Sequence, residues 1–351
     1  MKILKKILKA VLIIIVVLVL GFIGLIVYAM ISDYKPEEKE VISQSDSPSL
    51  LNDSLIFSFL TWNIGYAGLD KDMDFFKDGG TKVITPEDNF RENFSGIEDF
   101  LSKNDTIDFI YIQEIDRDSK RSYRVDEYEN VSKKLPGYKP FFAVNYDVFF
   151  VPAPPANPMG KVVSGLATYS KYTPESSTRY SLPGDFGFPT QLFYLDRCFM
   201  VNRYKLSGGK ELVLINTHNE AFDEGDIRKA QMEMIREYIM NEYNSGNYVI
   251  AGGDWNQYPP DFVPAFPENQ VNTSLMAVES DFLPLEWKWV FDPTSPSNRS
   301  VVAAYDPPTT TTDVRDFFVL SPNLESVSVK CYNLGFANSD HNPVIIEVKL
   351  K

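Results

Sequence analysis

The chain has 351 residues, of which 44% are hydrophobic, so it can bury a large core as one big domain or two ordinary ones. Its formal net charge is −14, and no basic arm outside the first ten residues offsets it, which disfavours tight sequence-independent binding of nucleic acid. Cys198 and Cys331 lie far apart in strand-like segments and match neither a metal motif nor a disulfide framework, so we expect both in the core.

The N-terminus has the features of a membrane anchor. Residues 10–31 carry no charge, and as a helix they would span about 33 Å, enough for the core of a bilayer. A cleavable signal peptide usually has a shorter apolar core and a small-x-small cleavage site, so we favour an uncleaved anchor. Four lysines precede the span: Lys2, Lys5, Lys6 and Lys9. The positive-inside rule therefore predicts a cytoplasmic N-terminus and an extracytoplasmic remainder.

These features divide the chain into four parts. Residues 1–9 are the basic cytoplasmic end, and residues 10–31 are the transmembrane helix. The polar composition of residues 32–52 predicts a tether. Residues 53–351 are expected to form the folded domain, which carries all of the motifs described below.

The first half of this domain alternates strands and helices. Apolar runs predict strands at 55–61, 107–112, 138–151 and 164–170. Pro86 at a first helical position, followed by apolar residues at helical spacing, predicts a helix after the first strand. A second helix is expected at 126–135.

The second half continues in the same way. Strands are expected at 192–204, 211–216, 248–251, 313–320, 326–332 and 344–350. The best helical spacing of apolar residues lies at 226–243. The Pro-rich and aromatic-rich residues after Asn256 indicate a long surface excursion, in which Trp287 and Trp289 either line a pocket or pack in the core. The whole pattern fits a layered α/β sandwich.

Polar residues stand at the ends of the predicted strands and interrupt one of them. They are Asn63, Glu114, His218, Asp254, Asn256, Asp316, Asp340 and His341. Each alone could be a strand cap or a turn residue. Charged groups are seldom buried singly, however, so several carboxylates at strand ends indicate a cation or a proton-transfer site. Oxygen ligands without a Cys/His cluster favour Mg²⁺ or Mn²⁺ over zinc.

The order of these residues resembles the endonuclease/exonuclease/phosphatase superfamily, which has the fold of pancreatic deoxyribonuclease. The matching motifs are Trp62-Asn63, Gln113-Glu114, Asn216-Thr217-His218, Gly253-Asp254-Trp255-Asn256, Asp316 and Ser339-Asp340-His341-Asn342-Pro343-Val344. The resemblance implies a four-layered α/β sandwich of two packed mixed β-sheets flanked by helices, here preceded by one transmembrane helix. Arg315 stands where this family often has an apolar residue before the Asp.

The resemblance also implies a metal site. Glu114 would hold a divalent metal, Mg²⁺ or Mn²⁺, and Asn63 and Asp340 would contribute directly or through water. Such an ion would place positive charge where the oxygens of a phosphoryl group gain negative charge in the transition state.

Five further residues are implied to be catalytic. His341, oriented by Asp316, would transfer a proton to or from the attacking water. Asp254 would position or deprotonate that water, and either of Asp254 and His341 could be the general base. Asn256 would hold a phosphate oxygen, and His218 would donate to the developing oxyanion.

The implied function is a membrane-anchored, outward-facing, metal-dependent phosphoesterase, with phosphodiesters favoured over monoesters. A surface nuclease for extracellular nucleic acid is one alternative, and the acidic charge speaks against it. A phospholipid or phosphoinositide head-group hydrolase is another, supported by the anchor and by the aromatic residues at 141–151 and 287–291. A catalytically inactive surface binding protein is the non-enzyme alternative. The expected partners are a phosphoester substrate and a lipid bilayer through residues 10–31, with no obligate protein partner.

Overall fold

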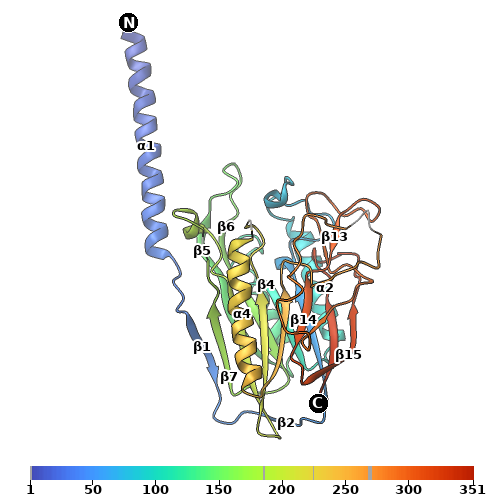
Figure 1. Ribbon diagram of the computed structural model, residues 1–351. Coiled ribbons are helices and arrows are strands. Elements are labelled where there is room, and N and C mark those ends of the chain that lie inside the picture. The colour runs from blue at the N-terminus through green and yellow to red at the C-terminus, as the bar shows by residue number, and fades with distance from the viewer. Residues whose placement is uncertain (1, 185, 224, 268–270) are drawn as a thin grey trace.

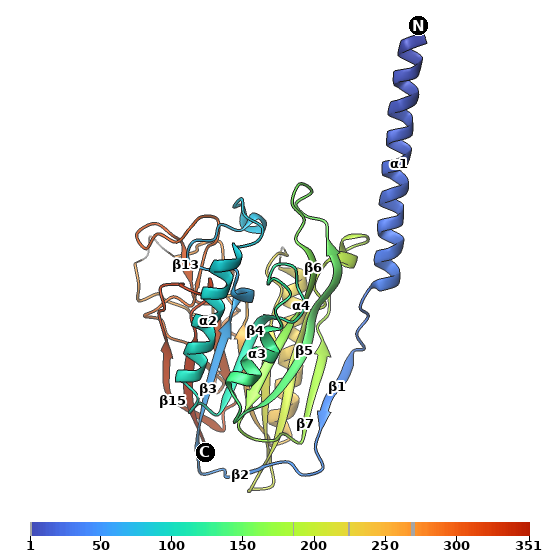
Figure 2. The same cartoon turned by 180° about the vertical axis from the view of Figure 1, so that it is seen from behind.

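The computed structural model describes residues 2–184, 186–223, 225–267 and 271–351. Two mixed β-sheets pack face to face, and helices cover the outer face of each, as Figures 1 and 2 show from opposite sides. The four-layered α/β sandwich expected from the sequence is therefore confirmed. A long apolar helix, α1 (Lys2–Ser32), stands at the N-terminus outside the sandwich.

One sheet has six strands. Their order is β15 (Leu324–Cys331), β16 (Val344–Leu350), β3 (Ile56–Asn63), β4 (Phe109–Asp116), β6 (Gly160–Ser170) and β5 (Lys139–Val151). Only β3 and β4 among these neighbours run parallel, and Asn63 pairs with Gln113. Because parallel strands end at the same edge, Asn63 and Glu114 come to one end of the sandwich.

The other sheet has eight strands. Their order is β1 (Lys39–Gln44), β7 (Ser176–Ser181), β8 (Cys198–Leu206), β9 (Glu211–His218), β10 (Tyr248–Asp254), β14 (Asp316–Leu320) and β11 (Lys288–Val290), with β2 (Leu50–Leu51) beside β8. The register sets Asp254 opposite His218 on one side and opposite Asp316 on the other. A separate ribbon pairs β12 (Asn298–Arg299) with β13 (Thr312–Asp313).

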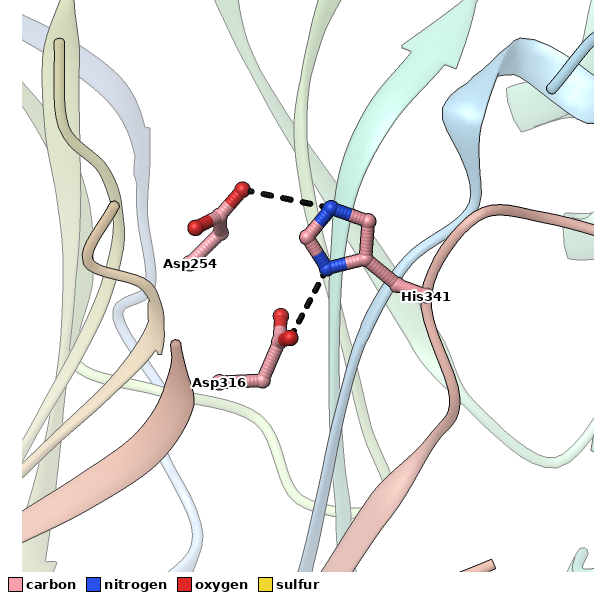
Figure 3. Close-up of side chains that lie close together, drawn as sticks. All are labelled: Asp254, Asp316 and His341. Carbon is pink, nitrogen blue, oxygen red and sulfur yellow. Dashed lines mark hydrogen bonds and ion pairs between the residues drawn. The ribbon is translucent and has the colours of Figure 1, made fainter. Parts of the chain in front are cut away.

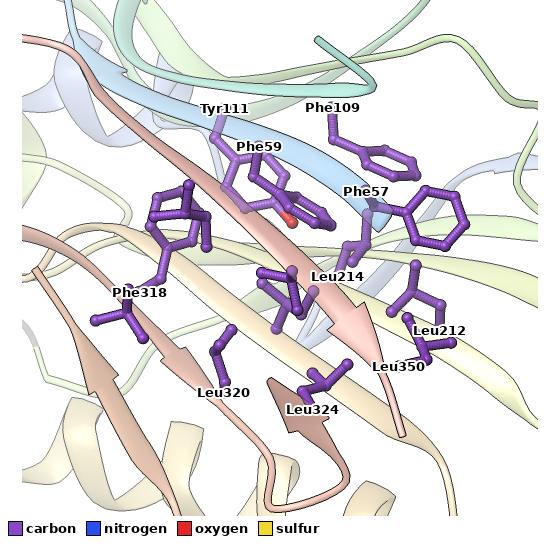
Figure 4. Close-up of a cluster of buried hydrophobic side chains, with 14 of the residues drawn as sticks. Phe57, Phe59, Phe109, Tyr111, Leu212, Leu214, Phe318, Leu320, Leu324 and Leu350 are labelled. Atoms are coloured by element: carbon purple, nitrogen blue, oxygen red, sulfur yellow. The ribbon is translucent and has the colours of Figure 1, made fainter. Parts of the chain in front are cut away.

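Aromatic side chains fill the space between the sheets (Figure 4). Phe59 stacks on Phe109 with ring centroids 4.9 Å apart, and Phe318 of the facing sheet meets Phe59 edge-on at 6.4 Å. All three side chains have no exposed surface. Their burial, at about 25 cal/mol per Å² of apolar surface, is the main force that holds the two sheets together.

Helices bury apolar stripes on the two outer faces. α2 (Glu87–Lys103) and α3 (Glu127–Lys134) cover the six-stranded sheet, and α4 (Asp226–Asn244) covers the other. In α2 the buried apolar residues are Phe90, Phe94, Ile97 and Leu101, which lie three or four positions apart and so share one face. Three short 3₁₀ helices lie in the connections among the described residues: η1 (Gly65–Ala67), η2 (Phe76–Asp78) and η3 (Thr190–Phe193).

The linker after α1 is shorter than predicted. The polar composition of residues 32–52 predicts a tether, but β1 pairs with β7, and β2 pairs with β8. The tether prediction is wrong for these two segments because a strand at the edge of a sheet is held by backbone hydrogen bonds and needs few apolar side chains. β1 belongs to the folded domain and covers the edge that β7 would otherwise expose.

One predicted strand begins later than expected. The strand expected from residue 192 begins at Cys198, because η3 comes first. The aromatic residues at 141–151 lie within β5, as the predicted strand at 138–151 requires. Trp287 packs against Tyr243 of α4 at 5.6 Å, and Trp289 joins the same core, so neither serves as a pocket residue.

α1 leaves the sandwich at the end where Asn63 and Glu114 lie. β5 runs parallel to β4, with β6 antiparallel between them, so the carboxyl ends of β4 and β5 share this end. Tyr28 near the end of α1 packs edge-on against Phe149 of β5, with ring centroids 4.7 Å apart. Figure 1 shows α1 extending away from this end of the sandwich.

The contact between the sheets gives a stability prediction. Phe318→Ala removes a fully buried ring and should lower the free energy of unfolding by about 3–5 kcal/mol. The control Val327→Ala shortens a side chain that is 48% exposed, and it should change the free energy of unfolding by less than about 0.5 kcal/mol. Urea unfolding of the full chain in detergent micelles, followed by tryptophan fluorescence, measures both. Equal losses in the two variants would contradict this assignment of the core.

Candidate active site

The residues expected at the site meet at one end of the sandwich. Asn63 and Glu114 come from the ends of β3 and β4, and His218 and Asp254 come from the ends of β9 and β10. Asp316 begins β14, Asn256 follows β10, and Asp340 and His341 precede β16. Both sheets thus contribute side chains to one place.

His341 lies between two carboxylates, as Figure 3 shows. Its Nδ1 is 2.8 Å from Oδ2 of Asp316, and its Nε2 is 3.6 Å from Oδ2 of Asp254. Ser297 also donates to Oδ2 of Asp316 at 2.7 Å. The three ring and carboxylate groups have ligand atoms within 4.8 Å of one another and could therefore hold a metal ion. Because Oδ2 of Asp316 already accepts two hydrogen bonds, the geometry favours a His–Asp proton-transfer pair.

The two histidines have opposite pKa shifts. Burial, helped by the positive charge of Arg197, lowers the pKa of His218 to about 4. Burial also opposes a charge on His341, but the carboxylates of Asp316, Asp254 and Asp340 outweigh it and raise the pKa. At neutral pH His218 is therefore a neutral imidazole and His341 an imidazolium.

Asn63 joins carboxylates from the two sheets. Its Nδ2 donates to Oε1 of Glu114 at 3.2 Å and to Oδ2 of Asp254 at 3.0 Å. Its Oδ1 accepts from the backbone N–H of Gly65 at 3.0 Å. To ligate a metal through oxygen, as the sequence predicts, Asn63 would have to turn its amide over.

Glu114 and Asp340 are suited to a divalent cation. Both line the cavity described below. Burial raises the pKa of Asp340 to about 7, His341 opposes this rise, and the charge of Glu114 adds to it. A cation between the carboxylates would relieve their repulsion. Gly65 leaves space beside them, because a Cβ there would lie 2.9 Å from Oδ1 of Asp340.

Asn256 is held in place from several sides. Its backbone N–H donates to Oδ1 of Asp254 at 3.0 Å, and its Nδ2 donates to the carbonyl of Asn219 at 2.9 Å. Arg315 donates to its Oδ1 at 3.0 Å, and Arg228 donates to its carbonyl at 2.7 Å. Asn256 lines the cavity, with one amide hydrogen not committed to these contacts.

A cavity of about 490 Å³ opens over these residues. Six cationic side chains line it: Lys77, Arg121, Arg197, Arg228, Arg299 and Arg315. Sequence reasoning noted only Arg315 and missed the other five, because they lie in loops, helices or a two-residue strand, outside any motif, and their convergence depends on tertiary structure. The first-turn position of Arg228 in α4, at the strand-end side of the sandwich, was the only signal available.

Residues 60–341 match the family described as the endonuclease/exonuclease/phosphatase family. The chain belongs to this family. It is therefore a phosphoric ester hydrolase, and the resemblance predicted from the motifs is confirmed. No curated protein matches the chain in sequence.

Several solved structures share the family fold. An endonuclease/exonuclease/phosphatase from Beutenbergia cavernae is 16% identical, with a TM-score of 0.59 over 84% of this chain and 72% of that one. ANGEL2, a 2',3'-cyclic phosphatase solved with adenosine-2',3'-vanadate, is 14% identical, with a TM-score of 0.55 over 90% and 99% of the two chains. TDP2 from D. rerio, solved with a single-strand DNA product, is 14% identical, with a TM-score of 0.54 over 84% and 99%. At these identities the likeness shows the fold alone.

The opposite shifts of the two histidines give a pH prediction. In the metal-free protein, the His218 resonance should remain that of a neutral imidazole until the pH falls to about 4. The His341 resonance should remain that of an imidazolium well above the ordinary value of 6.5. The sequence holds only two histidines, so NMR titration of the histidine-labelled full chain in micelles measures both.

His218→Gln assigns the signals, because it removes one of the two. If the two resonances titrate together near the ordinary histidine pKa, the electrostatic description of the site is wrong.

Proposed function

We propose that the protein is a membrane-anchored, outward-facing phosphodiesterase that depends on a divalent metal ion, Mg²⁺ or Mn²⁺. The observation that carries the proposal is the convergence of the His341–Asp316 pair, Asp254 and the Glu114 and Asp340 carboxylates on one cavity. The lysines in the first turns of α1, before its uncharged residues 10–31, and the mean hydropathy of 3.5 support the anchor and its orientation.

Glu114 and Asp340 would hold the metal ion, joined by Asn63 if its amide turns over. When bound, the ion would stabilise negative charge on the phosphoryl oxygens. Turning the Asn63 amide would also free Oδ2 of Asp254 from its hydrogen bond to that side chain.

Asp254 is suited to accept the proton of the attacking water. Burial opposes its charge, but His341, His218 and Arg315 hold its pKa below the ordinary value. An ionised Asp254 can take up the water proton as the oxygen attacks phosphorus. The carboxylates around His341 raise its pKa and favour its protonated form, so Asp254 is better suited than His341 to act as the base.

His341 would lie on the same side of the substrate as Asp254. Its Nε2 lies only 3.6 Å from Oδ2 of Asp254, whereas in-line displacement places the leaving group opposite the attacking water. His341 is therefore placed to donate to the water or to a phosphoryl oxygen, and Asp316 fixes its ring. Neutral His218, 3.5 Å from the same Asp254 oxygen, stands on the other flank as a further donor.

The end of the sandwich that carries the site favours a lipid head group as substrate. It is the end at which α1 leaves, so the cavity opens toward the bilayer that α1 would span. Phe222 and Met276 line the cavity and are 46% and 44% exposed, and Val302 beside it is 53% exposed. Exposed apolar side chains around a site mark a surface that contacts apolar partners.

Nucleic acid is the less favoured substrate. Arg121, Arg197, Arg228 and Arg299 are between 1% and 6% exposed, so their charge is directed into the cavity. A polymer is usually held by a basic groove that follows its backbone. Buried cations that line a cavity suit a small anionic group instead.

Metal dependence and the role of His341 are tested together. The full chain in micelles should hydrolyse bis(p-nitrophenyl) phosphate with Mg²⁺ and lose this activity in EDTA. His341→Ala should lower kcat by about 10²–10⁴-fold, the usual contribution of a proton-transfer group. The control Val327→Ala should keep full activity, and circular dichroism checks the fold of each. Activity that survives EDTA, or full activity in His341→Ala, would refute the proposal.

The substrate class is tested by offering phosphatidylcholine vesicles and double-stranded DNA in one Mg²⁺ buffer. Vesicle lipid should be hydrolysed faster than DNA. Val302→Ser alters a side chain beside the cavity that is 53% exposed, and it should slow vesicle hydrolysis more than hydrolysis of bis(p-nitrophenyl) phosphate. Val327→Ser, on β15, is the matched control. Cleavage of DNA with intact vesicles would establish the nuclease alternative.

A further inference from the structure

Three cations gather on one wall of the cavity: Lys77 of η2, Arg121 after β4 and Arg197 before β8. None of them belongs to the motifs that identify the family. They lie on the side of His218 and Glu114, since the order of strands places β8 beside β9. The His341–Asp316 pair lies on the other side, at β14.

Arg121 is fixed with part of its guanidinium free. Its Nε and Nη2 donate to the two carboxylate oxygens of Asp116 at 3.0 and 2.9 Å, and its Cζ lies 3.6 Å from the ring centroid of Tyr66. Its Nη1 has no hydrogen-bond partner among the described residues. A bidentate pair holds the group rigidly, so this remaining nitrogen is a fixed donor on the cavity wall.

Arg197 is held in a similar way. Its Nε donates to Oε2 of Glu220 at 3.2 Å, and its Nη1 contacts the carbonyl of His218 at 3.5 Å. Glu220 also accepts from the hydroxyl of Tyr194 and from two backbone N–H groups. Its carboxylate is therefore fully engaged, while Nη2 of Arg197 has no partner within the described ranges.

Lys77 forms no ion pair with any residue that the structure describes. Its Nζ lies 5.1 Å from the ring centroid of Tyr194 and 5.6 Å from that of Phe222. Burial and the neighbouring charges of Arg121 and Arg197 lower the pKa of Lys77 to about 8. Half-buried positive charge of this kind is costly unless an anion accompanies it.

The wall therefore carries hydrogen-bond donors without partners. Arg121 and Arg197 are paired with Asp116 and Glu220, whereas Lys77 is paired with no described carboxylate, although Glu114 and Asp78 line the same cavity. Asn145, which also lines the cavity, accepts from the backbone N–H of Cys198 through Oδ1 and keeps both Nδ2 hydrogens without a described partner. Guanidinium, ammonium and amide donors around one space are the usual surroundings of a phosphate.

We infer that Lys77, Arg121 and Arg197, with Asn145, form a second anion subsite that binds a phosphate group of the substrate other than the one hydrolysed. The inference rests on the proposed phosphodiesterase function and narrows its substrate. The substrate is a phosphodiester whose polar part carries an additional phosphate monoester. The substrate is either a lipid, whose head group is this polar part, or a soluble phosphodiester that carries the same polar part.

Paired substrates test the subsite and distinguish the two sources. One pair is phosphatidylinositol and phosphatidylinositol 4-phosphate in vesicles, and the other is glycerophosphoinositol and glycerophosphoinositol 4-phosphate in solution. The full-length wild type should prefer the phosphorylated member in kcat/KM. Lys77→Met should reduce that preference by about tenfold to a hundredfold, mainly through KM, since a hydrogen bond to a charged group has this value. Lys71→Met, an exposed lysine before η2, should retain it.

If the phosphorylated member is preferred only in vesicles, the substrate is a lipid. If it is preferred in both pairs, the soluble polar group alone is sufficient for recognition. Equal kcat/KM values within each pair of wild-type substrates would overturn the inference. An equal fall in kcat/KM for both members of a pair in Lys77→Met would also overturn the inference, because Lys77 would then act at the hydrolysed phosphate.

Binding without turnover separates this inference from the proposed function. In EDTA, inorganic phosphate should bind the wild type and His341→Ala with equal affinity by calorimetry, and Lys77→Met about tenfold or more weakly. This holds even if the chain hydrolyses none of the diesters. Equal binding by Lys77→Met, or no binding by the wild type, would show that the cations form no phosphate subsite.

Discussion

The packing of aromatic side chains between the two sheets is the constraint on which the site depends. Phe59 and Phe318 face one another across the interface, and the same two sheets bring Asn63 and Asp254 to their common edge. At that edge polar contacts replace apolar packing, and a 3.0 Å hydrogen bond from Asn63 to Asp254 connects the two sheets. The amide of Asn63 can reach the carboxylate of Asp254 only if the two sheets keep this spacing. Core packing and catalytic geometry are therefore a single requirement, and a loosened core would misplace the site before the chain unfolds.

Charge is distributed unevenly in this protein. The chain carries a formal net charge of −14, yet the cavity is lined by a lysine and five arginines, four of which are almost fully buried. An acidic exterior repels polyanions over the range of the Debye length, whereas a small phosphoester inside the cavity meets the buried cations at short distance and low dielectric. The mean charge of the chain thus opposes the approach of long polyanions, and the local charge of the cavity favours a small anionic group.

Much of the fold could be predicted from the sequence, because strand ends, helical spacing and six short motifs are local signals. The strand at 344–350 matches β16, and each predicted site residue lies at the common end of the sandwich. β1 escaped prediction because an edge strand needs no apolar pattern, and its sequence KEVISQ reads as a polar linker. The cavity arginines escaped for another reason. Arg121 and Arg197 lie in separate loops and Arg299 lies in the short strand β12, and nothing in their sequence neighbours shows that the fold will bring them together. The protonation states of His218 and His341 likewise depend on which charges lie within a few ångströms, and only the structure gives those distances.

The anion subsite and the orientation of the cavity are independent features that restrict the same substrate. The subsite is built from side chains after β4 and before β8, whereas the orientation follows from the contact of Tyr28 with Phe149. If α1 spans a bilayer, the cavity opens toward its surface, where phosphorylated head groups are concentrated. A polymer in solution would have to enter between the domain and the membrane, but a head group already lies there. An anchor in this position would therefore do more than retain the enzyme at a membrane, because it would set the direction from which a substrate reaches Lys77 and His341.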